Sequence, residues 1–198
     1  RKNRPIVIVM RAPDSVEYCR AVGVDLKGWF REKLVDVWIG AGYFRLNHWK
    51  VSADLAHSYG VKFYASLDEA RIPSGASGKK LPILPGRMTR EFYASRFVDA
   101  MASGCDGVYV FNIENAFMHK VCMMNPKDVS GVGRIRFAMN RGSGGYRPWS
   151  WVKDSAHFCN LSKIDPGEPL AVKAGETCSF EMFIGDDLSG LKASDVVA

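Results

Sequence analysis

The sequence lacks several patterns that would define its class at once. It has no apolar run of about 18 residues, the length that a membrane-spanning helix needs. It has no Cys-x-x-Cys pair, and its five cysteines are scattered and odd in number, which disfavours both a zinc site and a complete disulfide framework. No G-x-G-x-x-G follows a predicted strand, and no G-x-S-x-G elbow occurs. We therefore expect no membrane span, no dinucleotide cofactor and no serine-hydrolase chemistry.

The charge of the chain is positive and uneven. The formal net charge is +6, and residues 127–153 carry six basic residues against one acidic residue, together with aromatic side chains. Basic residues interleaved with aromatics can bind single-stranded nucleic acid. No recognition fold accompanies this charge, so a solvated surface with aromatic core positions is the preferred interpretation. We expect no nucleic-acid partner.

Four short runs rich in β-branched and aromatic residues recur in the first 120 residues. They begin near residues 6, 35, 61 and 107, and helical patterns separate them. Alternation of this kind predicts an α/β fold, with a parallel sheet and helices packed outside it. The first run, Ile6–Met10, is continuously apolar, which is typical of a strand that is buried on both faces.

The segments between these runs carry helix start and stop signals. Short polar side chains that can accept hydrogen bonds from a helix N-terminus precede the helical patterns, and glycine follows them. In the segment after Asp25 the apolar residues recur at helical spacing, which predicts a short helix there. We expect N-caps at Ser15, Asp25 and Thr89, helix ends at Gly23, Gly60 and Gly104, and a helical pattern that carries Leu26, Trp29, Phe30 and Leu34.

The pattern changes after about residue 118, where helical periodicity disappears. Short runs such as Arg134–Met139, Leu170–Val172 and Cys178–Ile184 alternate with turn signals. This is typical of an antiparallel β-domain. We therefore expect two domains: residues 1–120 form the βα part, and residues 121–198 form a small domain resembling a β-sandwich.

Polar residues follow the predicted strands where each strand ends. Right-handed crossovers between parallel strands would place all four carboxyl ends at one edge of the sheet. That is where α/β proteins usually hold their catalytic groups. The residues expected at this edge are Arg11, Asp14, Tyr43, Asp68, Glu69, Arg71, Asn112 and Glu114.

Two carboxylates at this edge suggest glycosidic chemistry. Hydrolysis of a glycosidic bond needs a proton donor and a second carboxylate that acts as nucleophile or base. Glu69 and Glu114 would come from different strand ends and are the candidate catalytic residues. Asp68 is weaker, because adjacent strand residues point in opposite directions. The candidate substrate-binding residues are Arg11, Tyr43, Asp68 and Asn112.

Other interpretations of these residues stay open. Glu69 could be a surface charge or the ion-pair partner of Arg71. The same edge could hold a glycan without cleaving it, as a binding or structural module would. A self-contained four-stranded domain that binds another small ligand is a third possibility. Asp36 and Asp106 lie at strand beginnings, on the opposite rim, where a structural role is expected.

Several short motifs occur in order along the βα part of the chain. They are Arg11-x-Pro13, Cys19-x-x-x-Gly23-x-Asp25-x-x-x-Trp29, Val35-Asp36, Ala56-His57-x-x-Gly60-Val61 and Gly104-x-Asp106-Gly107-Val108-Tyr109-x-Phe111-Asn112. Together this series resembles the C-terminal half of glycoside-hydrolase-like (β/α)8 barrels, proteins often labelled family-10-like glycosyl hydrolases. A later Gly185-Asp186-Asp187 is similar to a turn in the β-domain that tends to follow those barrels.

The resemblance implies that the four strands are the last four of eight. A complete barrel needs at least about 200 residues, so the chain would be a fragment. Its partner would be a missing N-terminal half of the barrel or another chain that supplies it. Related barrels place the nucleophile after the seventh strand, and Glu69 is the nearest match. The implied substrate is a carbohydrate, no cofactor is required, and the second carboxylate would lie in the missing sequence.

The beginning of the chain suggests processing. The first residue is Arg1, and no charged-then-apolar leader is visible. We expect that the original N-terminus has been removed. A periplasmic or extracellular location is favoured if a leader was removed with it.

Overall fold

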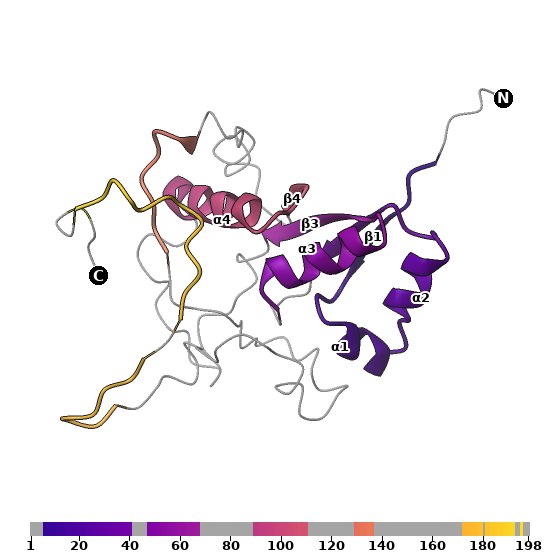
Figure 1. Cartoon of the computed structure of the whole chain (residues 1–198), viewed down its shortest axis with the longest axis horizontal. Helices are drawn as coiled ribbons and strands as arrows, with labels where there is room; N and C mark the ends of the chain where they lie inside the picture. Colours follow the sequence, from indigo (N-terminus) through magenta and orange to yellow (C-terminus); the bar gives the residue numbers. More distant parts are fainter. Residues whose placement is uncertain are drawn as a thin grey trace.

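Helices alternate with strands through the first half of the chain. The computed structural model describes residues 6–40, 47–67, 89–110, 129–136, 172–179, 181–192 and 195. The eight helices and strands with assigned bounds lie before residue 111 (Figure 1). In chain order they are β1 (Val9–Ala12), α1 (Val16–Ala21), α2 (Leu26–Arg31), β2 (Val37–Gly40), α3 (Trp49–Ser58), β3 (Lys62–Leu67), α4 (Arg90–Ala102) and β4 (Gly107–Val110).

The four strands form one parallel sheet in the order β1-β2-β3-β4. Val9 of β1 is in register with Val37 of β2, and Val37 is in register with Lys62 of β3. Tyr64 of β3 is in register with Gly107 of β4. The prediction of a parallel sheet that alternates with helices is confirmed. All four carboxyl ends therefore lie along one edge of the sheet.

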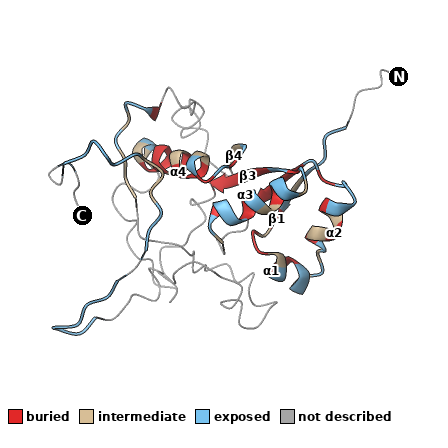
Figure 2. Cartoon of the chain, viewed as in Figure 1, coloured by how far each residue is buried: buried red, intermediate tan, exposed pale blue. Residues whose placement is uncertain are grey.

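The first strand begins later than its composition predicts. The apolar run Ile6–Met10 was expected to be a strand buried on both faces, but β1 begins at Val9. Ile6 is 86% exposed and Val7 is 62% exposed, and Figure 2 shows the exposed segment that leads into β1. The physical reason is the register, because β2 begins at Val37 opposite Val9 and offers no strand residues to Ile6 and Val7.

Side-chain caps begin three of the helices at the predicted residues. Ser15 Oγ accepts the Tyr18 N–H at 3.2 Å, and Asp25 Oδ1 accepts the Gly28 N–H at 3.1 Å. Thr89 Oγ1 accepts the Phe92 N–H at 3.2 Å. These bonds satisfy N–H groups that have no partner inside a helix. The predicted terminal glycines adopt left-handed conformations: φ is 86° at Gly23, 73° at Gly60 and 81° at Gly104.

One face of the sheet forms the core with the helices. The ring of Trp38 lies 5.5 Å from the ring of Phe30 on α2 and 4.9 Å from the ring of Phe63 on β3. Buried residues gather where α3 and α4 meet the sheet (Figure 2). Burying each large apolar side chain contributes about 1.5–3 kcal/mol. The strand residues on this face are Met10, Ala12, Trp38, Phe63, Ala65, Leu67, Val108 and Val110.

The other face of the sheet carries charged and hydroxyl-bearing residues as well as apolar ones. Because strand residues alternate between faces, the residues in between point away from the helices. None of them belongs to the core that the helices form. The strand residues on this open face are Val9, Arg11, Val37, Ile39, Lys62, Tyr64, Ser66 and Tyr109.

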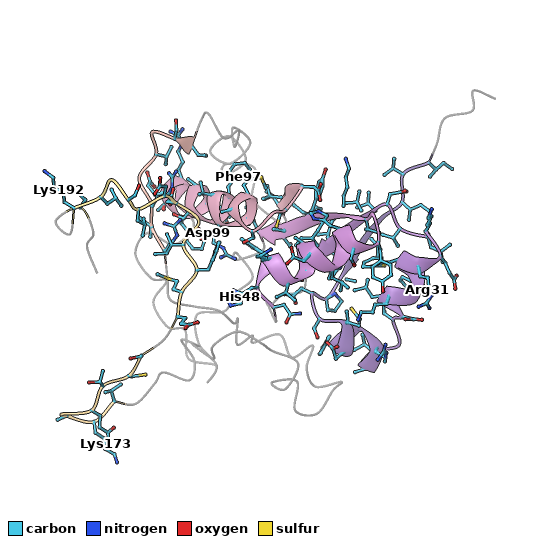
Figure 3. All side chains as sticks on the ribbon, viewed as in Figure 1. Arg31, His48, Phe97, Asp99, Lys173 and Lys192 are labelled. Atoms are coloured by element: carbon cyan, nitrogen blue, oxygen red, sulfur yellow. The ribbon has the colours of Figure 1, made fainter. Side chains whose placement is uncertain are left out.

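The described residues after 128 contain no strand, so the strands expected there are wrong at 134–136, 178–179 and 181–184. The segments instead direct backbone N–H groups to side chains of α4. The Ile135 N–H donates to Ser95 Oγ at 3.0 Å, and the Gly185 N–H donates to Asp99 Oδ1 at 2.8 Å. Figure 3 shows Asp99 where α4 meets the C-terminal segment.

Candidate functional site

The carboxyl edge of the sheet is the predicted location of the site. β3 ends at Leu67 and β4 ends at Val110, so the sequence continues from β3 directly into the two predicted carboxylates. Of the six residues predicted for catalysis and substrate binding, the structure describes Arg11, which lies in β1. The others lie outside the described residues: Tyr43, Asp68, Glu69, Asn112 and Glu114.

Arg11 reaches across the open face from one side of the sheet to the other. It belongs to β1, yet its Cζ atom lies 6.0 Å from the centre of the Tyr109 ring on β4. A guanidinium at this distance from an aromatic ring is attracted by the ring's negative face. The first and last strands of the described sheet therefore contribute to one group of side chains. Arg11 itself is exposed.

Two residues of β3 join this group. The Tyr64 ring lies over Gly107, where an added Cβ would come within 3.0 Å of the ring, so glycine at 107 makes room for it. Ser66 points to the same face and is in register with Tyr109. Ser66 is only 6% exposed, and its Oγ has no hydrogen-bond partner. A buried hydroxyl without a partner is costly.

The sequence interpretation missed Tyr64, Ser66 and Tyr109 as site residues. It treated Tyr64 and Tyr109 as parts of apolar runs, and Ser66 drew no attention. The signal that could have found them is the alternation along β3 and β4, because residues two apart share a face. Tyr64 and Ser66 are two apart, and each is flanked by small or apolar residues of the core face.

Asp14 lies at the carboxyl edge, in the turn after β1, but it has a structural role. It is 2% exposed, and its carboxylate accepts the Asn47 N–H at 3.0 Å. Its backbone carbonyl accepts bonds from Asn47 Nδ2 and from Ser52 Oγ, the latter at 3.3 Å. Asp14 thereby ties the turn after β1 to the beginning of α3, which fixes the edge near Arg11.

Asp36 and Asp106 lie at the amino edge, as expected, and both bind backbone. Asp36 Oδ2 accepts the Ile8 N–H at 2.8 Å. Asp106 Oδ2 accepts the Phe63 N–H at 2.9 Å and lies 2.8 Å from His57 Nε2. Burial would raise the pKa of Asp106, but its hydrogen bonds with His57 and Phe63 outweigh burial and hold the pKa below its usual value. These carboxylates fix the strand register.

The buried cysteines are not activated nucleophiles. Burial raises the pKa of Cys19 to about 12, with smaller contributions from Asp14 and Glu17. Burial also raises the pKa of Cys105 to about 12. A thiol must ionise to attack or to bind a metal, so both act as small core residues.

The described part of the chain offers neither a metal site nor a membrane-spanning helix. The residues described there include no group of three or more metal-ligating side chains. No helix among them is long and apolar enough to cross a bilayer.

Comparison with family models and with curated proteins adds no relative. No family model matches the sequence, and no curated protein gives a significant match. The functional inference therefore depends on the sheet, its carboxyl edge and the side chains of the open face.

Proposed function

We propose that the chain is part of a carbohydrate-active hydrolase of the glycoside hydrolase type, built on half of a (β/α)8 barrel. The observation that carries the proposal is the parallel order β1-β2-β3-β4, which puts all four carboxyl ends on one edge. The sequence places Asp68 and Glu69 directly after β3, and Glu114 shortly after β4. Two carboxylates from neighbouring strand ends suit cleavage of a glycosidic bond.

The proposed roles follow from the chemistry of each side chain. Glu69 serves as nucleophile or base, and Glu114 serves with it in acid–base chemistry or positions the sugar. Arg11 and Asn112 donate hydrogen bonds to sugar oxygens, and Tyr43 offers a ring to a sugar face. Asp68 assists in binding. The mechanism needs proton transfer and a carboxylate, and no cofactor.

The rest of the barrel comes from elsewhere in this proposal, either from a missing N-terminal half or from a partner chain. Two observations support it. β1 is an outer strand of the described sheet. The apolar residues that precede and begin it are exposed, including Ile8 at 48% and Val9 at 54%. Parallel sheets are normally covered on both faces, and a further strand along β1 would cover these residues.

The test compares Glu69→Gln with the unchanged full-length protein on a panel of glycans. The proposal expects turnover to fall by about 10²–10⁴-fold, while glycan binding is retained. Glu32→Gln is the matched control, because Glu32 is an exposed glutamate that follows α2. Binding without turnover in every form, the unchanged protein included, would favour a non-catalytic carbohydrate-binding module.

A further inference from the structure

Four side chains of the open face form a polar group near the carboxyl edge. We call them the open-face cluster: Arg11, Tyr64, Ser66 and Tyr109. Arg11, Ser66 and Tyr109 are each the last residue but one of their strand. By register, Arg11 and Tyr64 lie at one level of the sheet, and Ser66 and Tyr109 lie two residues nearer the edge that holds the predicted carboxylates.

Ser66 is the unusual member of the cluster. Its Oγ atom is buried and has no hydrogen-bond partner. Buried hydroxyls in folded proteins are nearly always bonded, and an orphaned one calls for an explanation. An alanine at this position would avoid the cost. The Ser66 hydroxyl is directed to the same face as the neighbouring Tyr109. The cluster therefore contains a hydroxyl that can still donate and accept a hydrogen bond, on the face that also carries the Arg11 guanidinium and the rings of Tyr64 and Tyr109.

The charged residues described on the open-face strands are basic and suit an anionic group on a ligand. Among the described strand residues that point to this face, the charged ones are Arg11 and Lys62, and both are basic. Lys62 lies at the amino end of β3, so among these described strand residues Arg11 is the one near the carboxyl edge. A guanidinium is well suited to a carboxylate, because its planar fork matches the two oxygens.

We infer that the open-face cluster binds a carbohydrate that carries a carboxylate, such as a uronic acid unit. This inference rests on the proposed function. Arg11 pairs with the sugar carboxylate, and Ser66 Oγ hydrogen-bonds to a neighbouring sugar oxygen. The ring of Tyr109 packs against the sugar beside the guanidinium, and Tyr64 borders the same position from β3. The cluster thus sets the preference for acidic sugars at the edge where cleavage is proposed.

The experiment measures the binding of digalacturonate and of the neutral galactose disaccharide with the same linkage by titration calorimetry. The acidic disaccharide is expected to bind at least about tenfold more tightly, because its carboxylate forms a charge-assisted hydrogen bond with the Arg11 guanidinium. Arg11→Met should remove this preference, and Arg11 is exposed, so the variant should fold. Equal affinity for the two disaccharides, or an unchanged preference in Arg11→Met, would overturn the inference.

Ser66→Ala provides a second, independent readout. Because Ser66 Oγ has no partner in the fold, its removal should raise the melting temperature while it weakens digalacturonate binding several-fold. Removal of a hydroxyl with only a structural role would not raise the melting temperature and weaken binding at the same time. The matched control is Ser95→Ala on α4, whose Oγ donates to the Glu91 carbonyl and accepts the Ile135 N–H. That variant should lower the melting temperature and leave binding unchanged.

The failure of this inference is distinguishable from the failure of the proposed function. If glycans are hydrolysed in a Glu69-dependent manner but acidic and neutral sugars bind alike, the function stands and the cluster's role is wrong. If digalacturonate binds through Arg11 and Ser66 but no glycan is cleaved, the cluster's role stands and the hydrolase is wrong.

Discussion

The Asp99 carboxylate on α4 accepts a hydrogen bond from Arg136 Nη2 at 2.8 Å, and both side chains are largely buried, at 6% and 12% exposure. Arg136 Nη2 also lies 2.6 Å from Asp186 Oδ2, and Arg134 Nε lies 3.1 Å from Asp186 Oδ1. Two segments far apart in the sequence are thus held on one helix by one ion network. Both segments belong to the predicted second domain, 121–198, and they contact α4 of the βα part.

Asp99→Asn should destabilise the protein by about 3 kcal/mol, because it removes the more deeply buried of the two carboxylates that compensate the Arg136 guanidinium and leaves that charge with Asp186 alone. Urea denaturation measures this. Asp54→Asn is the matched control: Asp54 pairs with Lys50 at 2.9 Å on the surface of α3. Exposed pairs contribute about 1 kcal/mol at most. Equal losses in the two variants would show that the network does not stabilise the fold.

Gly185→Ala should loosen the C-terminal segment from α4. A Cβ at residue 185 would lie 2.8 Å from Asp99 Cα and 2.9 Å from both Ala102 Cβ and the Val98 carbonyl oxygen, so the segment must move. Overpacking of this kind costs about 1–3 kcal/mol. The measurement is the rate of limited proteolysis within 181–192. Gly190→Ala, where a Cβ meets nothing within 4 Å, should leave that rate unchanged. Identical proteolysis of the two variants would contradict the close packing at Gly185.

The Asp106 carboxylate should make folding stability depend on acidity. Its pKa in the folded protein is lowered, so the stabilisation is fully present above the carboxyl's ordinary value of 3.8 and is lost as the pH falls through the folded pKa. Asp106→Asn keeps an oxygen for the Phe63 N–H but removes the charge. The free energy of unfolding, measured by urea titration at a series of acidic pH values, should fall less steeply in this variant. Parallel pH profiles for the variant and the unchanged protein would refute the role of Asp106.

Local signals of the fold were predictable, and tertiary ones were not. Ser15, Asp25 and Thr89 cap helices as predicted, because a cap depends on a few neighbouring residues. Leu34 was expected to belong to the second helical pattern, but α2 ends at Arg31 and Leu34 is 47% exposed. Lys33 takes a left-handed conformation with φ of 55°, which breaks the helical periodicity before Leu34.

The position of the candidate site was predictable from the sequence, but only some of its residues were. Strand–helix alternation was enough to predict which end of the sheet gathers the strand ends. It could not show that Arg11 crosses to Tyr109, because that contact joins strands about 100 residues apart and depends on the sheet between them. Nor could it reveal Ser66, whose missing partner is a property of the packed structure. The link between Asp99 and Arg136 is hidden for the same reason, since 37 residues separate them.

The proposal that a carbohydrate binds at the carboxyl edge of the sheet is tested most directly by NMR. The backbone amide chemical shifts are recorded while the protein is titrated with an oligosaccharide. The account predicts that the largest changes occur at the final residues of the four strands, which are Ala12, Gly40, Leu67 and Val110. Changes concentrated instead at the amino edge, around Asp36, Lys62 and Asp106, would contradict it.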